Sequence, residues 1–158
     1  MKIHTLTQEQ FLPISIAEAW EFFSSPKNLN DITPDDLGFR VTSPVIEKMH
    51  EGQIITYKVK LAPLVWVSWV TEIKAVDKES CFIDEQRFGP YKFWHHRHHF
   101  EAVDGGVMMR DVVHYAMPFG IFGTIAHAIF ARRKLNWIFG YRKQVLEARF
   151  GTRSKRLS

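Results

Sequence analysis

Apolar and polar residues alternate over most of the chain between residues 2 and 117, and this period of two predicts β-strands. Neighbouring side chains of a strand point to opposite faces of the sheet, so alternation places one apolar face against a core. Turn-forming residues separate the runs. We therefore expect strands over residues 2–13, 39–43, 54–61, 65–76 and 80–88, and two long strands on either side of Asp104-Gly-Gly106.

Helical signals lie between the first two strands. Ser15 and Glu18 have the spacing of a capping box and precede an apolar side that contains Trp20. Ser25-Pro26 predicts a second short helix that ends near Ile32, because proline is favoured in a first helical turn. Residues 33–38 are rich in turn formers, so we expect a loop there.

A long amphipathic helix is predicted at the end of the chain. It is expected to begin between Phe119 and Gly123 and to end near Phe150 and Gly151, where glycine supplies a stop. The apolar residues that recur with the helical period are Phe122, Ile125, Ile129, Leu135, Ile138, Val145 and Leu146.

The order of these elements predicts an α+β fold. A curved antiparallel sheet of about six to seven strands would wrap around the long C-terminal helix, with the two short helices after strand 1. A curved sheet and a helix need not fill the space between them, so a cavity there is the natural ligand site. Residues 1–151 are expected to form a single domain and residues 152–158 a basic tail, because no internal repeat or linker interrupts the pattern.

The two long strands at residues 88–117 combine imidazoles, a carboxylate and large aromatic rings on one face. Pairing them through the glycine turn would bring His96 or His98 near Asp111. The residues that share this face by parity are Trp94, His96, His98 and Phe100 on one strand and Met109, Asp111, Val113, Tyr115 and Met117 on the other. This mixture suits a pocket better than a plain core.

Several motifs resemble those of START-like, Bet v 1-like helix-grip proteins of the SRPBCC superfamily. They are Phe82-Ile-Asp84-Glu-Gln86, Phe88-Gly-Pro-Tyr91, Trp94-x-His96-x-His98-x-Phe100, Asp111-x-Val-x-Tyr115 and Pro118-Phe-Gly120. The nearest resemblance is to a bacterial subgroup labelled ligand-binding or cell-division-inhibitor-like, related to polyketide cyclases and dehydrases. It implies a pocket between the sheet and the last helix. The implied ligand-binding residues are Tyr57, Val59, Trp69, Thr71, Asp84, Gln86, Trp94, His96, His98, Asp111 and Tyr115.

The polar residues of this set allow several chemistries. Two imidazoles and a carboxylate such as Asp84 or Asp111 can form a three-ligand metal site, but the resemblance implies no metal and we expect none. His96, His98 and Asp111 would be the catalytic residues of an enzyme that transfers protons. The same side chains can also satisfy one another as a hydrogen-bond network that fixes the sheet.

We expect a protein that binds a hydrophobic or amphipathic small molecule, such as a lipid, a quinone or a polyketide-like compound, as a carrier or sensor. No cofactor fingerprint is present, so no cofactor is expected. One alternative is a cyclase-like or dehydratase-like enzyme; replacing His98 or Asp111 by Ala should then abolish turnover while fold and affinity persist. A second alternative is a protein-interaction module that regulates cell division, whose partner the sequence does not identify.

Composition and charge narrow these classes. The formal net charge of +4 is moderate and comes with no nucleic-acid-binding module, so no nucleic-acid partner is expected. The basic residues near the C-terminus predict a solvated helix face, with a transient contact to an anionic membrane surface as the alternative. Cys81 is the only cysteine, which excludes an intrachain disulfide. We find no signal-like or membrane-spanning apolar run and expect a cytoplasmic protein.

Overall fold

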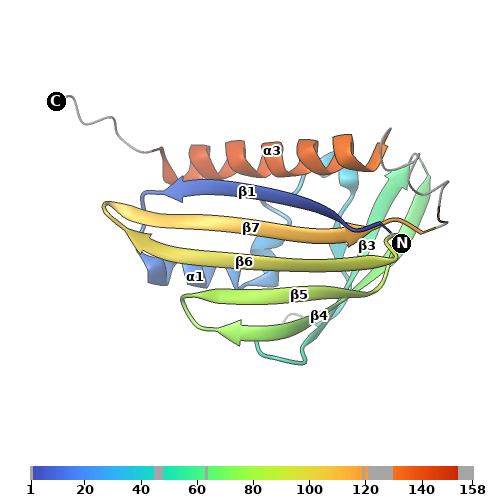
Figure 1. The fold of residues 1–158 in the computed structure, drawn as a ribbon, viewed down its shortest axis with the longest axis horizontal. Helices are drawn as coiled ribbons and strands as arrows, with labels where there is room; N and C mark the ends of the chain where they lie inside the picture. Colours follow the sequence, from blue (N-terminus) through green and yellow to red (C-terminus); the bar gives the residue numbers. More distant parts are fainter. Residues whose placement is uncertain (1, 45–47, 63, 119, 121–129, 153–158) are drawn as a thin grey trace.

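One antiparallel sheet of seven strands dominates the computed structural model, which describes residues 2–44, 48–62, 64–118, 120 and 130–152 (Figure 1). The strand order across the sheet is β1-β7-β6-β5-β4-β3-β2. The strands are β1 His4–Leu12, β2 Arg40–Val41, β3 Ile54–Ala62, β4 Val65–Asp77, β5 Cys81–Phe88, β6 Phe93–Val103 and β7 Gly106–Ala116. Period-two alternation thus predicted every strand of the described chain, and the α+β prediction is confirmed.

Helices pack against one face of this sheet, which we call the inner face. They are α1 Ile16–Phe23, η1 Pro26–Leu29, η2 Asp35–Leu37 and α3 Arg132–Phe150. The second helix ends at Leu29, earlier than predicted, and the predicted loop at residues 33–38 contains the 3-10 turn η2. The predicted end of the long helix is confirmed, whereas its predicted start and most of the basic tail lie outside the described residues. No helix of the described part of the chain is long and apolar enough to cross a bilayer.

The hairpin between β6 and β7 sets the register on which the site depends. Asp104 and Gly105 form the turn, and Gly105 has a φ of 79°, which glycine adopts without strain. Gly106 already pairs with Val103, so Asp111 faces His98 across the strands. The predicted approach of Asp111 to His98 is therefore confirmed.

Helix α3 runs along the sheet beside β1, as Figure 1 shows. Its buried residues are Leu135, Phe139, Arg142 and Leu146, which recur at helical spacing. Gln8 and Gln10 of β1 donate side-chain hydrogen bonds of 3.0 Å to the backbone carbonyls of Phe139 and Lys143. Successive inward residues of a strand and successive turns of a helix have nearly equal spacing, so two glutamines can hold two turns.

The capping box at the start of α1 gives a direct test of local stability. Ser15 Oγ accepts a hydrogen bond from the Glu18 amide, and the Glu18 carboxylate accepts one from the Ser15 amide. We expect Ser15→Ala to lower the free energy of unfolding by about 1 kcal/mol, because the Glu18 amide loses its acceptor. Chemical denaturation measures this. Glu21→Ala, at an exposed position of the same helix, should change it by less than about 0.5 kcal/mol; equal effects would contradict the assignment.

Candidate functional site

A mostly apolar cavity of about 210 Å³ lies between the inner face of the sheet and helix α3. Strands β3 to β6 supply one wall, and residues of α1, η1, η2, α3 and the connecting segments supply the rest. Large rings dominate the lining, among them Phe39, Tyr57, Trp69, Trp94 and Phe139. An apolar cavity of about 150 Å³ is large enough to bind benzene, so this space can hold a ring-sized body.

Eight of the eleven residues predicted to bind a ligand line this cavity. They are Tyr57, Val59, Trp69, Thr71, Asp84, Trp94, His96 and His98. Their contact with a ligand stays a prediction. Gln86, Asp111 and Tyr115 do not line the cavity. The Gln86 side-chain amide donates to the carbonyl of Tyr91 at 2.6 Å, Asp111 lies fully buried beneath the histidines, and Tyr115 is buried with its ring 5.8 Å from that of Tyr91.

The aromatic part of the wall comes from three rings that contact one another. Trp94 meets Trp69 edge to face, with centroids 5.2 Å apart, and Tyr91 lies 4.9 Å from Trp94. Tyr91 belongs to the motif Phe88-Gly-Pro-Tyr91 but was not predicted to line the cavity. Burial raises the pKa of the Tyr57 and Tyr91 hydroxyls, so both stay neutral and can donate a hydrogen bond. Trp66 and Trp137 do not line the cavity, and both side chains are exposed.

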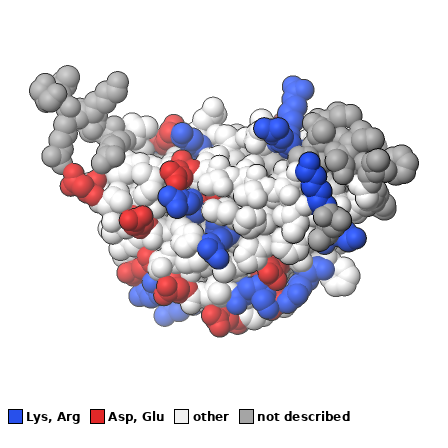
Figure 2. Space-filling view, in the orientation of Figure 1, with Lys and Arg blue, Asp and Glu red and all other residues white. Residues whose placement is uncertain are grey.

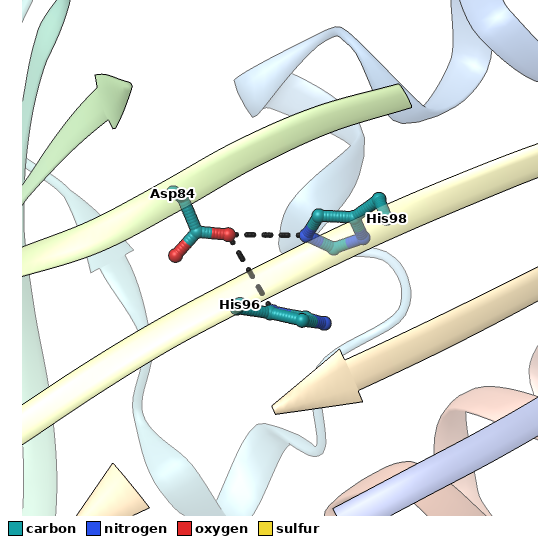
Figure 3. Close-up of side chains that lie close together, drawn as sticks. All are labelled: Asp84, His96 and His98. Carbon is teal, nitrogen blue, oxygen red and sulfur yellow. Dashed lines mark hydrogen bonds and ion pairs between the residues drawn. The ribbon is translucent and has the colours of Figure 1, made fainter. Parts of the chain in front are cut away.

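Four polar side chains form a closed cluster at one wall of the cavity. Asp84 comes from β5, His96 and His98 from β6, and Asp111 from β7. Oδ2 of Asp84 lies 3.0 Å from Nε2 of His98 and 3.4 Å from Nδ1 of His96, and Figure 3 shows the carboxylate pointing toward both rings. Oδ1 of Asp111 lies 3.1 Å from Nε2 of His96 and 2.8 Å from Nδ1 of His98. Each imidazole therefore contacts a carboxylate at both nitrogens.

Burial and mutual charge determine the ionisation of this cluster. Burial alone would raise the pKa of the Asp111 carboxyl, but the charge of His98 and hydrogen bonds from both histidines hold it well below its usual range. Burial would lower the pKa of His98, yet the Asp111 and Asp84 carboxylates raise it. Burial and the neighbouring charge of His98 lower the pKa of His96. The two histidines therefore differ, with His98 the more readily protonated.

Arg142 of α3 is a cavity residue that sequence reasoning missed. It is only 8% exposed, although its basic neighbourhood predicted a solvated helix face. Its Nη1 lies 3.9 Å from Oδ2 of Asp111, and its guanidinium stacks over the ring of Phe139 at 4.9 Å. Among the described residues, neither Nε of Arg142 nor Oδ2 of Asp111 has a hydrogen-bond partner. The available signal was its spacing of seven residues from Leu135 and four from Leu146.

The opposite, outer face of the sheet carries a different charge pattern. Lys and Arg are interspersed with Asp and Glu over the face in Figure 2. His95 Nδ1, for example, lies 2.9 Å from Oε1 of Glu85, and Arg110 pairs with Glu9. These partly exposed pairs contribute little stability and form no single-sign surface. The buried cluster is thus the distinctive polar feature of the sheet.

Comparison with known proteins shows the fold. Neither a protein-family model nor a curated protein matches the sequence. Among solved structures, protein CV1439 from Chromobacterium violaceum is 13% identical, with a TM-score of 0.69 over 94% of this chain and 98% of that one. The allergen Ara h 8.0201 is 16% identical, with a TM-score of 0.61 over 93% and 99%. A Thalictrum flavum norcoclaurine synthase variant, solved with a transition-state analogue, is 13% identical, with a TM-score of 0.64 over 94% and 96%. These likenesses confirm the Bet v 1-like helix-grip fold that the motifs predicted.

Proposed function

We propose that this protein, a chain with the Bet v 1-like helix-grip fold, binds a compact amphipathic small molecule in the cavity as its carrier or sensor. The observation that carries the proposal is the cavity itself, an apolar space with one polar wall beneath the C-terminal helix. Ligand sites in proteins combine a mostly apolar lining with a few oriented polar groups. The lining of rings and the His-Asp cluster have this composition.

The volume favours some of the expected ligand classes over others. A space of about 210 Å³ accepts a body of one or two rings, whereas a long acyl chain needs more room. The rings of Trp69 and Trp94 offer faces and edges against which a flat molecule stacks favourably. A quinone-like or polyketide-like aromatic body therefore fits better than a lipid with a long chain.

The polar wall indicates how such a ligand would be oriented. Arg142 lines the cavity with a guanidinium whose nearest carboxylate oxygen is 3.9 Å away. A buried guanidinium gains most from a hydrogen-bonded anionic oxygen, because its desolvation is otherwise only partly offset. We propose that a carboxylate or phenolate oxygen of the ligand points toward Arg142 and the histidines.

Blocking the cavity tests the proposal. Val59 lines the cavity on β3, and Val59→Phe should fill part of the space. We expect at least a tenfold loss of affinity, about 1.4 kcal/mol, for naphthalene-1-sulfonate, a two-ring aromatic anion, measured by fluorescence titration, because the new ring occupies space that the probe needs. Ile54→Phe adds a similar ring at an exposed position of the same strand and should leave the affinity unchanged.

Native mass spectrometry of gently purified protein, followed by solvent extraction, identifies any natural ligand. A stoichiometric aromatic or polyketide-like mass that is absent from Val59→Phe would support the proposal. An empty cavity in the wild-type protein, together with equal probe binding by the Val59 and Ile54 variants, would contradict it.

The enzyme alternative rests on fewer residues than the sequence suggested. Asp111 is fully buried and does not line the cavity, so it could act only by orienting His96 and His98. Once a ligand is identified, turnover is measured on that compound with wild-type protein and with His98→Gln. Turnover that His98→Gln abolishes while binding persists would favour the enzyme over the carrier.

A further inference from the structure

We propose that Asp84, His96 and His98 bind a divalent transition-metal ion, with Zn²⁺ as the reference ion, at the polar wall of the cavity. One ligand atom from each residue lies within 4.8 Å of the other two, and both histidines are buried. Two imidazoles and a carboxylate are a common set of three protein ligands for catalytic zinc and related ions. This proposal depends on the ligand geometry and not on the identity of the molecule that occupies the cavity.

The distances suit a shared ion as well as they suit hydrogen bonds. Nitrogen and oxygen ligands about 2.0–2.1 Å from a tetrahedral ion lie about 3.3–3.4 Å from each other. The Asp84 oxygen lies 3.0 Å and 3.4 Å from the two imidazole nitrogens. The ring centroids of His96 and His98 are 3.8 Å apart, and the dashed lines of Figure 3 join one Asp84 oxygen to both rings. All three atoms lie within 4.8 Å of one another, so rotation of these side chains would bring them to the spacing that an ion requires.

Asp111 supplies the outer partner that metal-binding histidines usually have. A ligating imidazole typically donates its second N–H to a carboxylate, which fixes its tautomer and orientation. Here one oxygen of Asp111 contacts the second nitrogen of both His96 and His98, at 3.1 Å and 2.8 Å. Asp111 is fully buried and so holds both rings from behind. The cluster thus has the inner and the outer partners of a metal site.

One buried nitrogen of the cluster lacks a hydrogen-bond partner among the described residues. His96 Nε2 bonds to Asp111 at 3.1 Å and His98 Nε2 to Asp84 at 3.0 Å, and two neutral imidazoles can donate both bonds. Nδ1 of His98 lies 2.8 Å from Oδ1 of Asp111 but has no hydrogen-bond partner. A cation bound on the Asp84 side would take the place of the hydrogen bond at His98 Nε2, so that His98 would carry its proton on Nδ1, toward Asp111.

The remaining coordination positions would face the cavity, because Asp84, His96 and His98 line it and Asp111 does not. A divalent ion, the two carboxylates and Arg142 together carry one net positive charge. An anionic ligand oxygen would neutralise that charge, which places the polar end of a cavity ligand on the ion.

Equilibrium dialysis of tag-free protein, stripped with EDTA and incubated with ZnCl₂, tests the site. We expect about one equivalent of zinc in the wild-type protein. His98→Gln and Asp84→Asn should each lose it. The matched control is His95→Gln, which removes a histidine that contacts Glu85 from the outer face of the same strands and should keep the zinc. Asp111→Asn should bind about 10–100-fold more weakly, because it disturbs only the outer partner.

Cobalt substitution gives a second readout that a merely structural role of the cluster would not produce. Co²⁺ held by these side chains should give a visible absorption band that Asp84→Asn abolishes and His95→Gln retains. Circular dichroism identifies any variant that fails to fold. If either His98→Gln or Asp84→Asn does not fold, zinc binding by the other variant decides the test. Substoichiometric zinc in the wild-type protein, or equal zinc loss in His95→Gln, would overturn the proposal.

Discussion

Asp111→Leu is expected to lower the free energy of unfolding by about 3–5 kcal/mol, because it leaves charged groups buried without their counter-charge. Asp111 is fully buried, and its carboxylate contacts His96, His98 and Arg142. Leucine has the branched shape of aspartate but is larger and offers no acceptor. Thermal denaturation should show a midpoint roughly 6–20 °C lower, given about 2–4 °C per kcal/mol for a chain of this size.

Arg110→Ala is the control for this change. Arg110 precedes Asp111 on β7 but faces outward, where it pairs with Glu9 in an exposed contact. Its removal should cost at most about 1 kcal/mol. Similar losses for both variants would show that strand β7 is sensitive to any substitution and that the cluster contributes nothing special. The same burial makes Asp111→Ala a poor test of catalysis, contrary to the expectation from sequence that the fold would tolerate it.

The second large effect is expected for Leu146→Ala in helix α3, with a loss of about 3–5 kcal/mol in the free energy of unfolding. Leu146 is fully buried in a cluster that includes Leu12, Trp20 and Phe100. Only four described residues of α3 are buried, and one of them is Arg142. Each of the three buried apolar residues therefore contributes a large share of the free energy with which α3 packs on the sheet. Urea denaturation followed by far-ultraviolet circular dichroism measures the loss.

Gln144→Ala, at an exposed position of the same helix, should change stability by less than about 0.5 kcal/mol. If Leu146→Ala also behaves in this way, then α3 is held mainly by the hydrogen bonds from Gln8 and Gln10. The variants Gln8→Ala and Gln10→Ala would separate that contribution from the apolar one.

The strand pattern was predictable because burial on one face of a sheet forces alternation in the sequence. His96 and His98 follow this rule as strictly as Trp94 and Phe100, so parity placed them on one face, and the resemblance to helix-grip proteins assigned that face to the interior. The sequence left the partner of Asp111 open as His96 or His98, and the observed turn at Asp104 and Gly105 makes His98 the residue opposite Asp111. Fold and polar cluster were therefore within reach of local rules.

Arg142 was not predictable in the same way, because a basic residue near other basic residues usually marks a solvated helix face. Its burial depends on Asp111, a partner distant in sequence whose inward direction is set by the sheet. Gln8 and Gln10 are similar cases, since their polar ends face inward only because α3 offers carbonyl groups there. Local sequence patterns therefore do not predict the burial of side chains whose partners are distant in the sequence.

The contacts of β1 carry a consequence for synthesis on the ribosome. This strand is made before the other strands of the sheet, yet it pairs with β7, and Gln8 and Gln10 bond to residues more than 130 positions later. A nascent chain cannot complete the sheet edge or close the helix over the cavity until α3 has emerged from the exit tunnel. Because such distant contacts fold slowly, the unfinished chain exposes unpaired strands, and we expect it to depend on chaperones until α3 can pack.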